Sequence, residues 1–232
     1  LTIHASSSDG TLSGTTDVRA IGGKATYSGL ILSNQIGTYS LSFRAIDAGY
    51  TGLSIGQSIN LAAGTAVALG MVNQPSTGGP TGSNFANQPS VEVIDAFGNR
   101  VLTDTGREIS VSYPAGANGG TLSGSPNVTT VDGLASFSGL SFVGKPGTNY
   151  KLHFAVAGNT LTATDSNNFQ VMHADATQVV IVQEPLGGNA TRSPLTVQPI
   201  VEIQDQYGNI VETGDDSTRV ITVRIHSDNN TN

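Results

Sequence analysis

The stretch QPSVEVIDAFGNRV at residues 88–101 returns as QPIVEIQDQYGNIV at residues 198–211, which is 110 residues further along the chain. Three more blocks repeat with the same offset. They are TLSG at 11 and 121, GxAx(Y/F)SGL at 23 and 133, and a Val-x-x-Pro segment at 72 and 182. Four blocks that share one offset indicate a tandem repeat in which each period is one structural unit.

The repeat also sets the expected domain organisation. Residues 64–173 make one complete module, residues 1–63 match only the second part of a module, and residues 174–232 match only the first part. A partial sandwich exposes open sheet edges and part of its core. We expect the missing strands to lie in a longer parent chain, and completion by a neighbouring copy through strand exchange is the alternative.

The local pattern is that of β-strands throughout. Tyr150, Leu152 and Phe154 alternate with the polar residues Lys151 and His153. Alternation with a period of two predicts strands with one buried and one solvated face, as in antiparallel sheets. About seven strands are expected in the complete module: 66–73, 88–95, 108–113, 121–131, 134–142, 149–157 and 160–171. In the last partial module, Ile221, Val223 and Ile225 predict one more strand.

The fold class that follows is all-β, with tandem immunoglobulin-like antiparallel β-sandwich modules of about seven strands each. Tyr39 and Tyr150 each follow a Gly-Thr turn and begin a strand, with a leucine two residues later. This arrangement is that of a tyrosine corner, although a buried tyrosine at the start of a strand would give the same pattern.

The motifs VE(V/I)xDx(F/Y)GNxV, TLSG, GxAx(F/Y)SGL and GxYxLxF together resemble the bacterial immunoglobulin-like (Big) repeats of the invasin and intimin type. The resemblance extends over the whole chain, as one full and two partial modules. It implies an exported, tandemly repeated spacer of the kind found in adhesins, S-layer proteins and other large surface proteins. It specifies no ligand.

The amino-acid composition limits the classes of partner that this chain is expected to bind. The net charge is −7, and ten basic residues are scattered singly, so no basic patch for nucleic acid is expected. No stretch approaches the ~20 apolar residues of a membrane span. There is no cysteine, so packing has to stabilise each module without a disulfide. The chain begins at Leu1, which we interpret as the start of a processed or excerpted chain.

The repeated turn after the VEV strand is the best candidate for a site. Asp95 with Gly98 and Asn99, and Asp205 with Gly208 and Asn209, are expected to form structural turns in which the carboxylate caps backbone N–H groups. Asp95, Asn99, Asp205 and Asn209 are also weak calcium candidates at module junctions, because calcium prefers carboxylate and amide oxygens. One carboxylate per turn falls short of the six to eight oxygens that calcium requires.

No catalytic motif is present, so no enzyme activity and no cofactor are expected. Asn127, Asn189 and Asn229 begin sequons for glycosylation. The expected function is a non-catalytic structural repeat of a cell-surface or extracellular protein, a semi-rigid spacer or lattice element whose partners are neighbouring modules. The alternative is a glycan- or protein-binding module that uses loops 76–87 and 114–120.

Overall fold

The computed structural model describes residues 1–114, 117–158, 161–187 and 192–224. Within these ranges the chain is all-β, as the sequence predicts, and it contains no α-helix. Two short 3-10 turns, Ala117–Gly119 and Asp215–Thr218, are its only helical segments there. The strands form several small sheets that are almost entirely antiparallel.

The central part of the chain, residues 64–173, is a sandwich of two main sheets, which we call the central unit. One sheet has the strand order β13-β9-β7 and the other β12-β10-β15-β16. The strands of these sheets are β7 (Ala66–Asn73), β9 (Ser90–Asp95), β10 (Glu108–Ser112), β12 (Asn127–Thr129), β13 (Leu134–Ser136), β15 (His153–Ala155) and β16 (Thr164–Asp165). Two smaller pairs complete the unit: β11 (Thr121–Ser123) with β14 (Ser141–Val143), and β8 (Gly79–Pro80) in parallel with β17 (Val171–Met172).

The hydrophobic core of the chain lies between the sheets of the central unit. Val91 and Val93 from one sheet and Ile109 and Phe154 from the other are fully buried, because strand alternation turns them toward the opposite layer. An aromatic cluster extends this core toward one end of the sandwich. Its members, in edge or tilted contact, are Tyr113, Phe142, Tyr150 and Phe169.

Three predicted strands of the central unit are divided. The stretch 160–171 contains β16 and the start of β17, which lie in different sheets. The other two divide at a glycine: 121–131 forms β11 and β12, and 134–142 forms β13 and β14. The breaks fall at Gly124 (φ 109°) and Gly139 (φ 68°), where the chain passes from one sheet to another. A Cβ atom on Gly124 would lie 2.5 Å from the carbonyl oxygen of Gly139, so the two backbones meet where only glycine fits.

Residues 1–63, the first unit, contain one main sheet of order β3-β1-β5-β6. Its register matches that of β12-β10-β15-β16 in the central unit: Ile3 pairs with Val18 as Ile109 pairs with Val128. The strands are β1 (Thr2–Ser7), β2 (Thr11–Ser13), β3 (Asp17–Arg19), β4 (Ile31–Ser33), β5 (Gly37–Ala45) and β6 (Ser54–Leu61).

The remaining described residues, 174–187 and 192–224, form the third unit, whose sheet consists of β18 (Ala176–Gln183) and β19 (Ile200–Asp205). These two strands correspond to β7 and β9. The strand predicted from Ile221 and Val223 does not form: residues 219–224 are irregular and Val223 is 80% exposed. Its counterpart β10 lies between β12 and β15, and the described part of this unit offers no equivalent neighbours. Ile225 lies outside the described residues.

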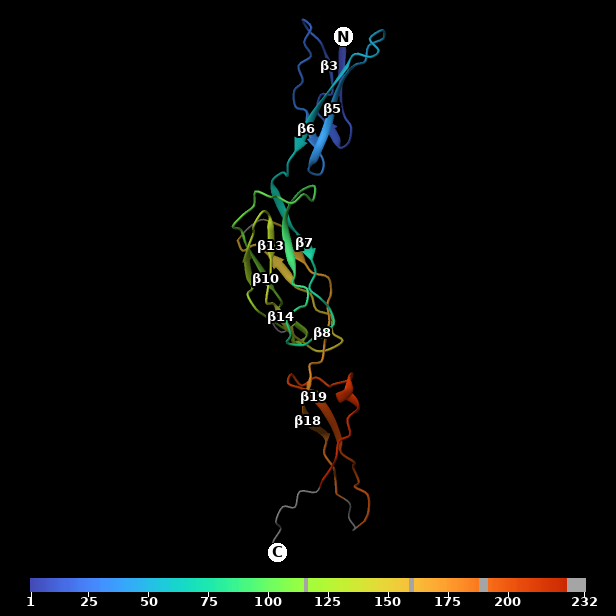
Figure 1. Cartoon of the computed structure of the whole chain (residues 1–232), viewed down its shortest axis with the longest axis vertical. Helices are drawn as coiled ribbons and strands as arrows, with labels where there is room; N and C mark the ends of the chain where they lie inside the picture. The colour runs from blue at the N-terminus through green and yellow to red at the C-terminus, as the bar shows by residue number, and fades with distance from the viewer. Residues whose placement is uncertain (115–116, 159–160, 188–191, 225–232) are drawn as a thin grey trace.

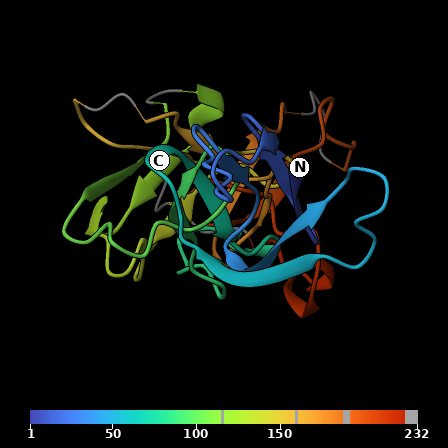
Figure 2. The same ribbon diagram turned by 90° about the horizontal axis from the view of Figure 1, so that it is seen from above.

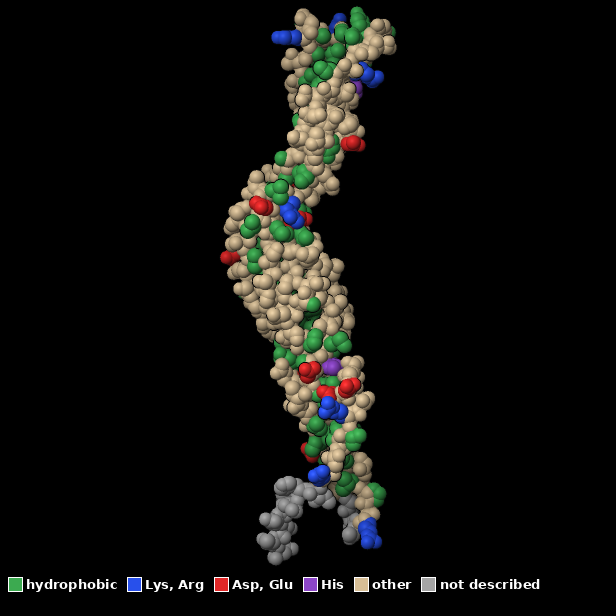
Figure 3. Space-filling view, in the orientation of Figure 1, with side chains coloured by type: hydrophobic (Ala, Val, Ile, Leu, Met, Phe, Trp, Pro, Cys, Tyr) green, Lys and Arg blue, Asp and Glu red, His purple; other side chains and the backbone are tan. Residues whose placement is uncertain are grey.

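The three units follow one another along a single axis, with the N-terminus and the third unit at opposite ends of the molecule (Figure 1). Viewed along that axis, the units lie largely over one another (Figure 2). Charged side chains are sparse and scattered over the surface in view, most of which is neither charged nor hydrophobic (Figure 3).

Candidate functional site: the junctions between units

The carboxylate of Asp95 organises the turn that follows β9. Its Oδ1 accepts the backbone N–H groups of Phe97 and Asn99, both at 2.9 Å. Gly98, at φ 79°, supplies the left-handed residue that the turn needs. Its Oδ2 accepts the side-chain amide of Asn99 at 3.0 Å and the N–H of Gly64 in the linker at 2.7 Å. One carboxylate therefore fixes both the turn and the linker.

Asp205 repeats this arrangement after β19. It accepts the N–H groups of Tyr207 and Asn209 at 2.8 and 2.9 Å, and the linker N–H of Ala174 at 2.9 Å. The amide of Asn209 donates to the same carboxylate at 3.0 Å, and Gly208 has φ 81°. Equivalent atoms of the repeated motif thus hold equivalent linkers at the two junctions.

These bonds determine the charge state of both carboxylates. Burial raises the pKa of Asp95, but hydrogen bonds from Asn99, Gly64 and Phe97 outweigh it and hold the pKa at about 2. Burial likewise raises the pKa of Asp205, and the bonds from Asn209, Ala174 and Tyr207 lower it overall. Both side chains are therefore buried anions at neutral pH, and the N–H groups that donate to them stabilise the negative charge.

The hydrogen bonds to Asp95 and Asp205 also affect whether these residues could bind calcium. Both oxygens of Asp95 face N–H hydrogens, as do both oxygens of Asp205. A cation at these oxygens would have to displace those donors, because N–H hydrogens repel a positive ion. Asn99 and Asn209 point their amide nitrogens at the carboxylates. In the described part of the chain, no three His, Asp or Glu side chains gather as a metal site would require.

At the first junction, Asn99 also reaches the preceding unit. Its Oδ1 accepts the N–H of Ile36 at 2.8 Å, and its Nδ2 lies 3.3 Å from the carbonyl oxygen of Asn34. Asn34 and Ile36 belong to the turn between β4 and β5 of the first unit. Asn99 is 6% exposed, so these bonds are largely shielded from water. The sequence motif suggested a local turn and gave no sign of this contact.

The second junction is held by different side chains. His173 Nδ1 donates to the carbonyl oxygen of Ala174 at 2.9 Å, and its Nε2 accepts the N–H of Thr213 at 3.2 Å. With these partners Nδ1 is the donor and Nε2 the acceptor of the ring. Tyr207 packs its hydroxyl against Gly82 of the central unit, in space that a side chain at position 82 would fill.

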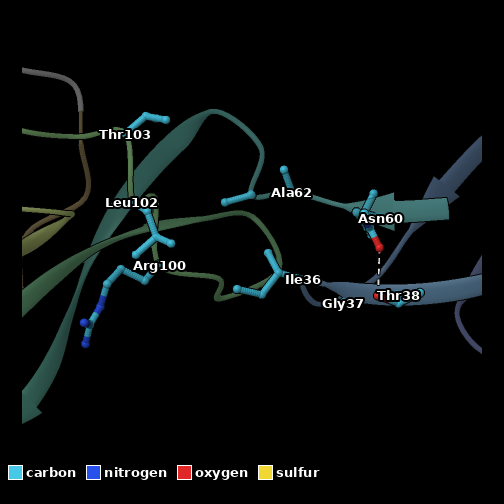
Figure 4. A pocket seen from close by; sticks show the side chains of 10 residues that line it. Ile36, Gly37, Thr38, Asn60, Ala62, Arg100, Leu102 and Thr103 are labelled. Atoms are coloured by element: carbon cyan, nitrogen blue, oxygen red, sulfur yellow. Dashed lines mark hydrogen bonds between the residues drawn. The ribbon is translucent and has the colours of Figure 1, made fainter.

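A groove of about 610 Å³ opens beside the first junction (Figure 4). Ile36 and Leu102 lie on opposite sides of it, and Thr38 donates to Asn60 at 2.7 Å along one edge. At the second junction, His173 and Thr213 take the places of the lining residues Ala63 and Thr103. The lining holds one charged side chain, Arg100, which pairs with Glu92 at 2.6 Å, and it offers no acid–base pair for catalysis.

The other candidate residues are placed as follows. The hydroxyl of Tyr39 donates to the carbonyl oxygen of Gln35 at 2.7 Å, and that of Tyr150 lies 3.2 Å from the carbonyl oxygen of Lys145. In each case the hydroxyl contacts a carbonyl oxygen four or five residues earlier in the chain. Asn127 is exposed at the start of β12, whereas Asn189 and Asn229 lie outside the described residues. No helix in the described ranges is long and apolar enough to cross a membrane.

Comparison with known proteins gives a limited picture. No family model matches the chain, and no curated protein matches it. Among solved structures it is similar to a β-glucuronidase of Parabacteroides merdae (13% identity, TM-score 0.33) and a β-glycosidase of Bacteroides vulgatus (11%, 0.35). Each alignment covers 73% of this chain and 21% of the other. The chain thus spans about a fifth of those enzymes, and similarity this low carries no argument about activity.

Proposed function

We propose that this chain is a non-catalytic structural repeat of a cell-surface or extracellular protein, in which it acts as a semi-rigid spacer. In this proposal its modules are immunoglobulin-like repeats of the invasin and intimin type, and the chain is part of an adhesin stalk, an S-layer or a fibre. Its partners are the neighbouring modules.

The observation that carries this proposal is the hydrogen-bond network at the first junction. A linker between independent domains usually leaves their relative orientation free. Here Asp95 holds the linker at Gly64, and Asn99 holds the preceding unit at Ile36, from the same turn. Bending at this junction would break bonds that are partly shielded from water, so the arrangement resists bending.

Distance measurements between paired labels test this stiffness directly. The chain has no cysteine, so cysteines introduced at the exposed positions Ser58 and Ser123 would carry spin labels on the first and central units alone. We expect a narrow distance distribution for the wild type and a broader one for Asn99→Ala. Stiffness as the function would be refuted by a wild-type distribution as broad as that of a flexible linker.

Asn209→Ala is the matched control. Asn209 occupies the equivalent position at the second junction, but within the described residues its side chain bonds only to Asp205. The variant loses the same intra-turn bond without losing a contact between units. It should leave the Ser58–Ser123 distribution unchanged, whereas equal broadening by the two variants would mean that the turn alone matters.

The groove at the first junction favours one second candidate, a glycan- or protein-binding module. Its volume falls in the range of small-ligand sites, and it lies apart from the loops 76–87 and 114–120 considered from sequence, of which residues 115–116 are not described. Binding of the intact chain to a glycan panel, abolished by Leu102→Asp, would support this function over the spacer.

A further inference from the structure

The sequon Asn127-Val128-Thr129 forms strand β12 of the central unit, which is a complete module. Side chains two residues apart in a strand point to the same face. Asn127 and Thr129 are accordingly exposed, whereas Val128 between them is half-buried. The amide that accepts a sugar and the hydroxyl that the sequon requires are therefore accessible from solvent on one face. We propose that Asn127 carries an N-linked glycan and that this glycan shields the open edge of the sheet.

The strand that carries the sequon lies at the edge of its sheet. Within the described residues β12 pairs only with β10, in the order β12-β10-β15-β16. The N–H of Val111 in β10 donates to the carbonyl oxygen of Pro126 at 2.7 Å, and backbone groups alternate in direction along a strand. Those of Asn127 and Thr129 therefore point away from β10, to the side where the sheet ends. Such a row of unpaired N–H and C=O groups can pair with a strand of another chain.

The first unit has charged residues at the same edge. In the matching register of the two sheets, Asp17 and Arg19 of β3 occupy the positions of Asn127 and Thr129. Both are exposed, and charged side chains on an edge strand are one means by which proteins prevent pairing with another sheet. The central unit has two uncharged residues at these positions, and these two residues belong to the sequon. A bulky, hydrated glycan on Asn127 would protect this edge in place of charge.

The face of the sheet beside Asn127 has small side chains. Asn127 lies opposite Ser110 of β10, and Ser110 lies opposite Ala155 of β15. The equivalent row of the first unit consists of larger or charged residues, Asp17, His4 and Arg44. Directly opposed side chains are close neighbours on the face of a sheet. Because the neighbours of Asn127 are small, the first sugar ring has room to lie along the sheet beside them.

The modification is a sugar transfer catalysed by a separate transferase, from a lipid-linked sugar phosphate. The side-chain amide nitrogen of Asn127 forms a bond to C1 of the sugar. The bond from C1 to the phosphate oxygen breaks, the lipid phosphate leaves with the electron pair, and the amide nitrogen loses one proton to a base of the transferase. Sequons of this kind are modified in exported chains, so this inference rests on the extracellular location in the proposed function and not on the spacer role.

The test is the mass of the tryptic fragment 108–151 of the protein isolated from its own source, since Asn127 begins the one sequon in this fragment. We expect the added mass of at least one sugar residue, located on Asn127. Thr129→Ala should abolish it, whereas the matched control Thr129→Ser keeps the hydroxyl and should keep the sugar. An unmodified fragment from protein recovered outside the cell or on its surface would overturn the proposal alone. Unmodified protein found only inside the cell would overturn the extracellular location as well.

Sedimentation velocity of the same protein tests the shielding of the edge. Asn127→Gln removes the sugar and leaves the edge uncharged, so copies should associate at concentrations at which the glycosylated protein does not. Asn127→Lys is the matched control: it also removes the sugar, but it places on the edge a lysine, which opposes pairing, so association should not increase. If Asn127→Gln associates no more than the glycosylated protein, or if both variants associate equally, the shielding of this edge is overturned.

Discussion

Asp95→Ala removes the acceptor on which four N–H groups converge, so its cost can be worked out bond by bond. The N–H of Phe97 lies in an exposed turn and can bind water instead. The backbone N–H and the side-chain amide of Asn99 are buried and would lose this acceptor, whereas Gly64 is exposed and its N–H can also bind water. Each unsatisfied buried donor costs about 1–3 kcal/mol, so we expect the central unit to lose about 2–5 kcal/mol of stability.

Urea denaturation followed by near-ultraviolet circular dichroism measures this loss. Most of the close aromatic pairs, including those of Phe142 and Tyr150, lie in the central unit, so the signal reports mainly on that unit. Asp95→Asn should cost less, because its amide oxygen still accepts the turn N–H groups while its NH₂ group faces the donor Gly64. Asp205→Ala is the control, which should leave the aromatic transition in place. A change below about 0.5 kcal/mol for Asp95→Ala, which is typical of surface substitutions, would refute the reasoning.

Three further outcomes are expected. Gly124→Ala should destabilise the central unit by more than about 2 kcal/mol, because the added Cβ would collide with the carbonyl oxygen of Gly139. Gly158→Ala is the control: Gly158 has φ 66° but open space around it, so the substitution should cost only about 1 kcal/mol. The pKa of Asp95 is lowered to about 2 and that of Asp205 is also lowered, so both carboxylates contribute their full stability above the ordinary aspartate pKa of about 4. In an acid titration the contribution of Asp95 should be lost as the pH falls toward 2, and that of Asp205 should decline below the ordinary aspartate pKa. Calcium and a chelator should leave the melting temperature unchanged in calorimetry, since both carboxylates already face N–H donors; a rise of several degrees with calcium would contradict this.

The structural role expected for the turn motif could be predicted because its bonds are local. Asp95 and Asp205 each accept from residues two and four positions later, and a short carboxylate before Gly-Asn favours such bonds. The bonds of Asn99 to Asn34 and Ile36 could not be predicted. They join positions more than 60 residues apart, and Asn209 carries the same motif without them.

The sequence by itself determined the all-β class, the period of the repeat and the inward face of central strands such as β9 and β10, because alternation and repetition are properties of neighbouring residues. Only the tertiary structure decided where strands break and which segments become strands at all. The motifs TLSG (121–124) and SGL (138–140) each lie within a stretch that the sequence predicts as one continuous strand. In the structure each stretch is divided into two strands at its glycine, Gly124 or Gly139, where the two backbones touch. Residues 134–136 form a strand whereas 24–26, with the same motif, do not. The physical reason is that sheet hydrogen bonds come from distant partners, and a local pattern shows a strand's orientation without showing whether its partner is present.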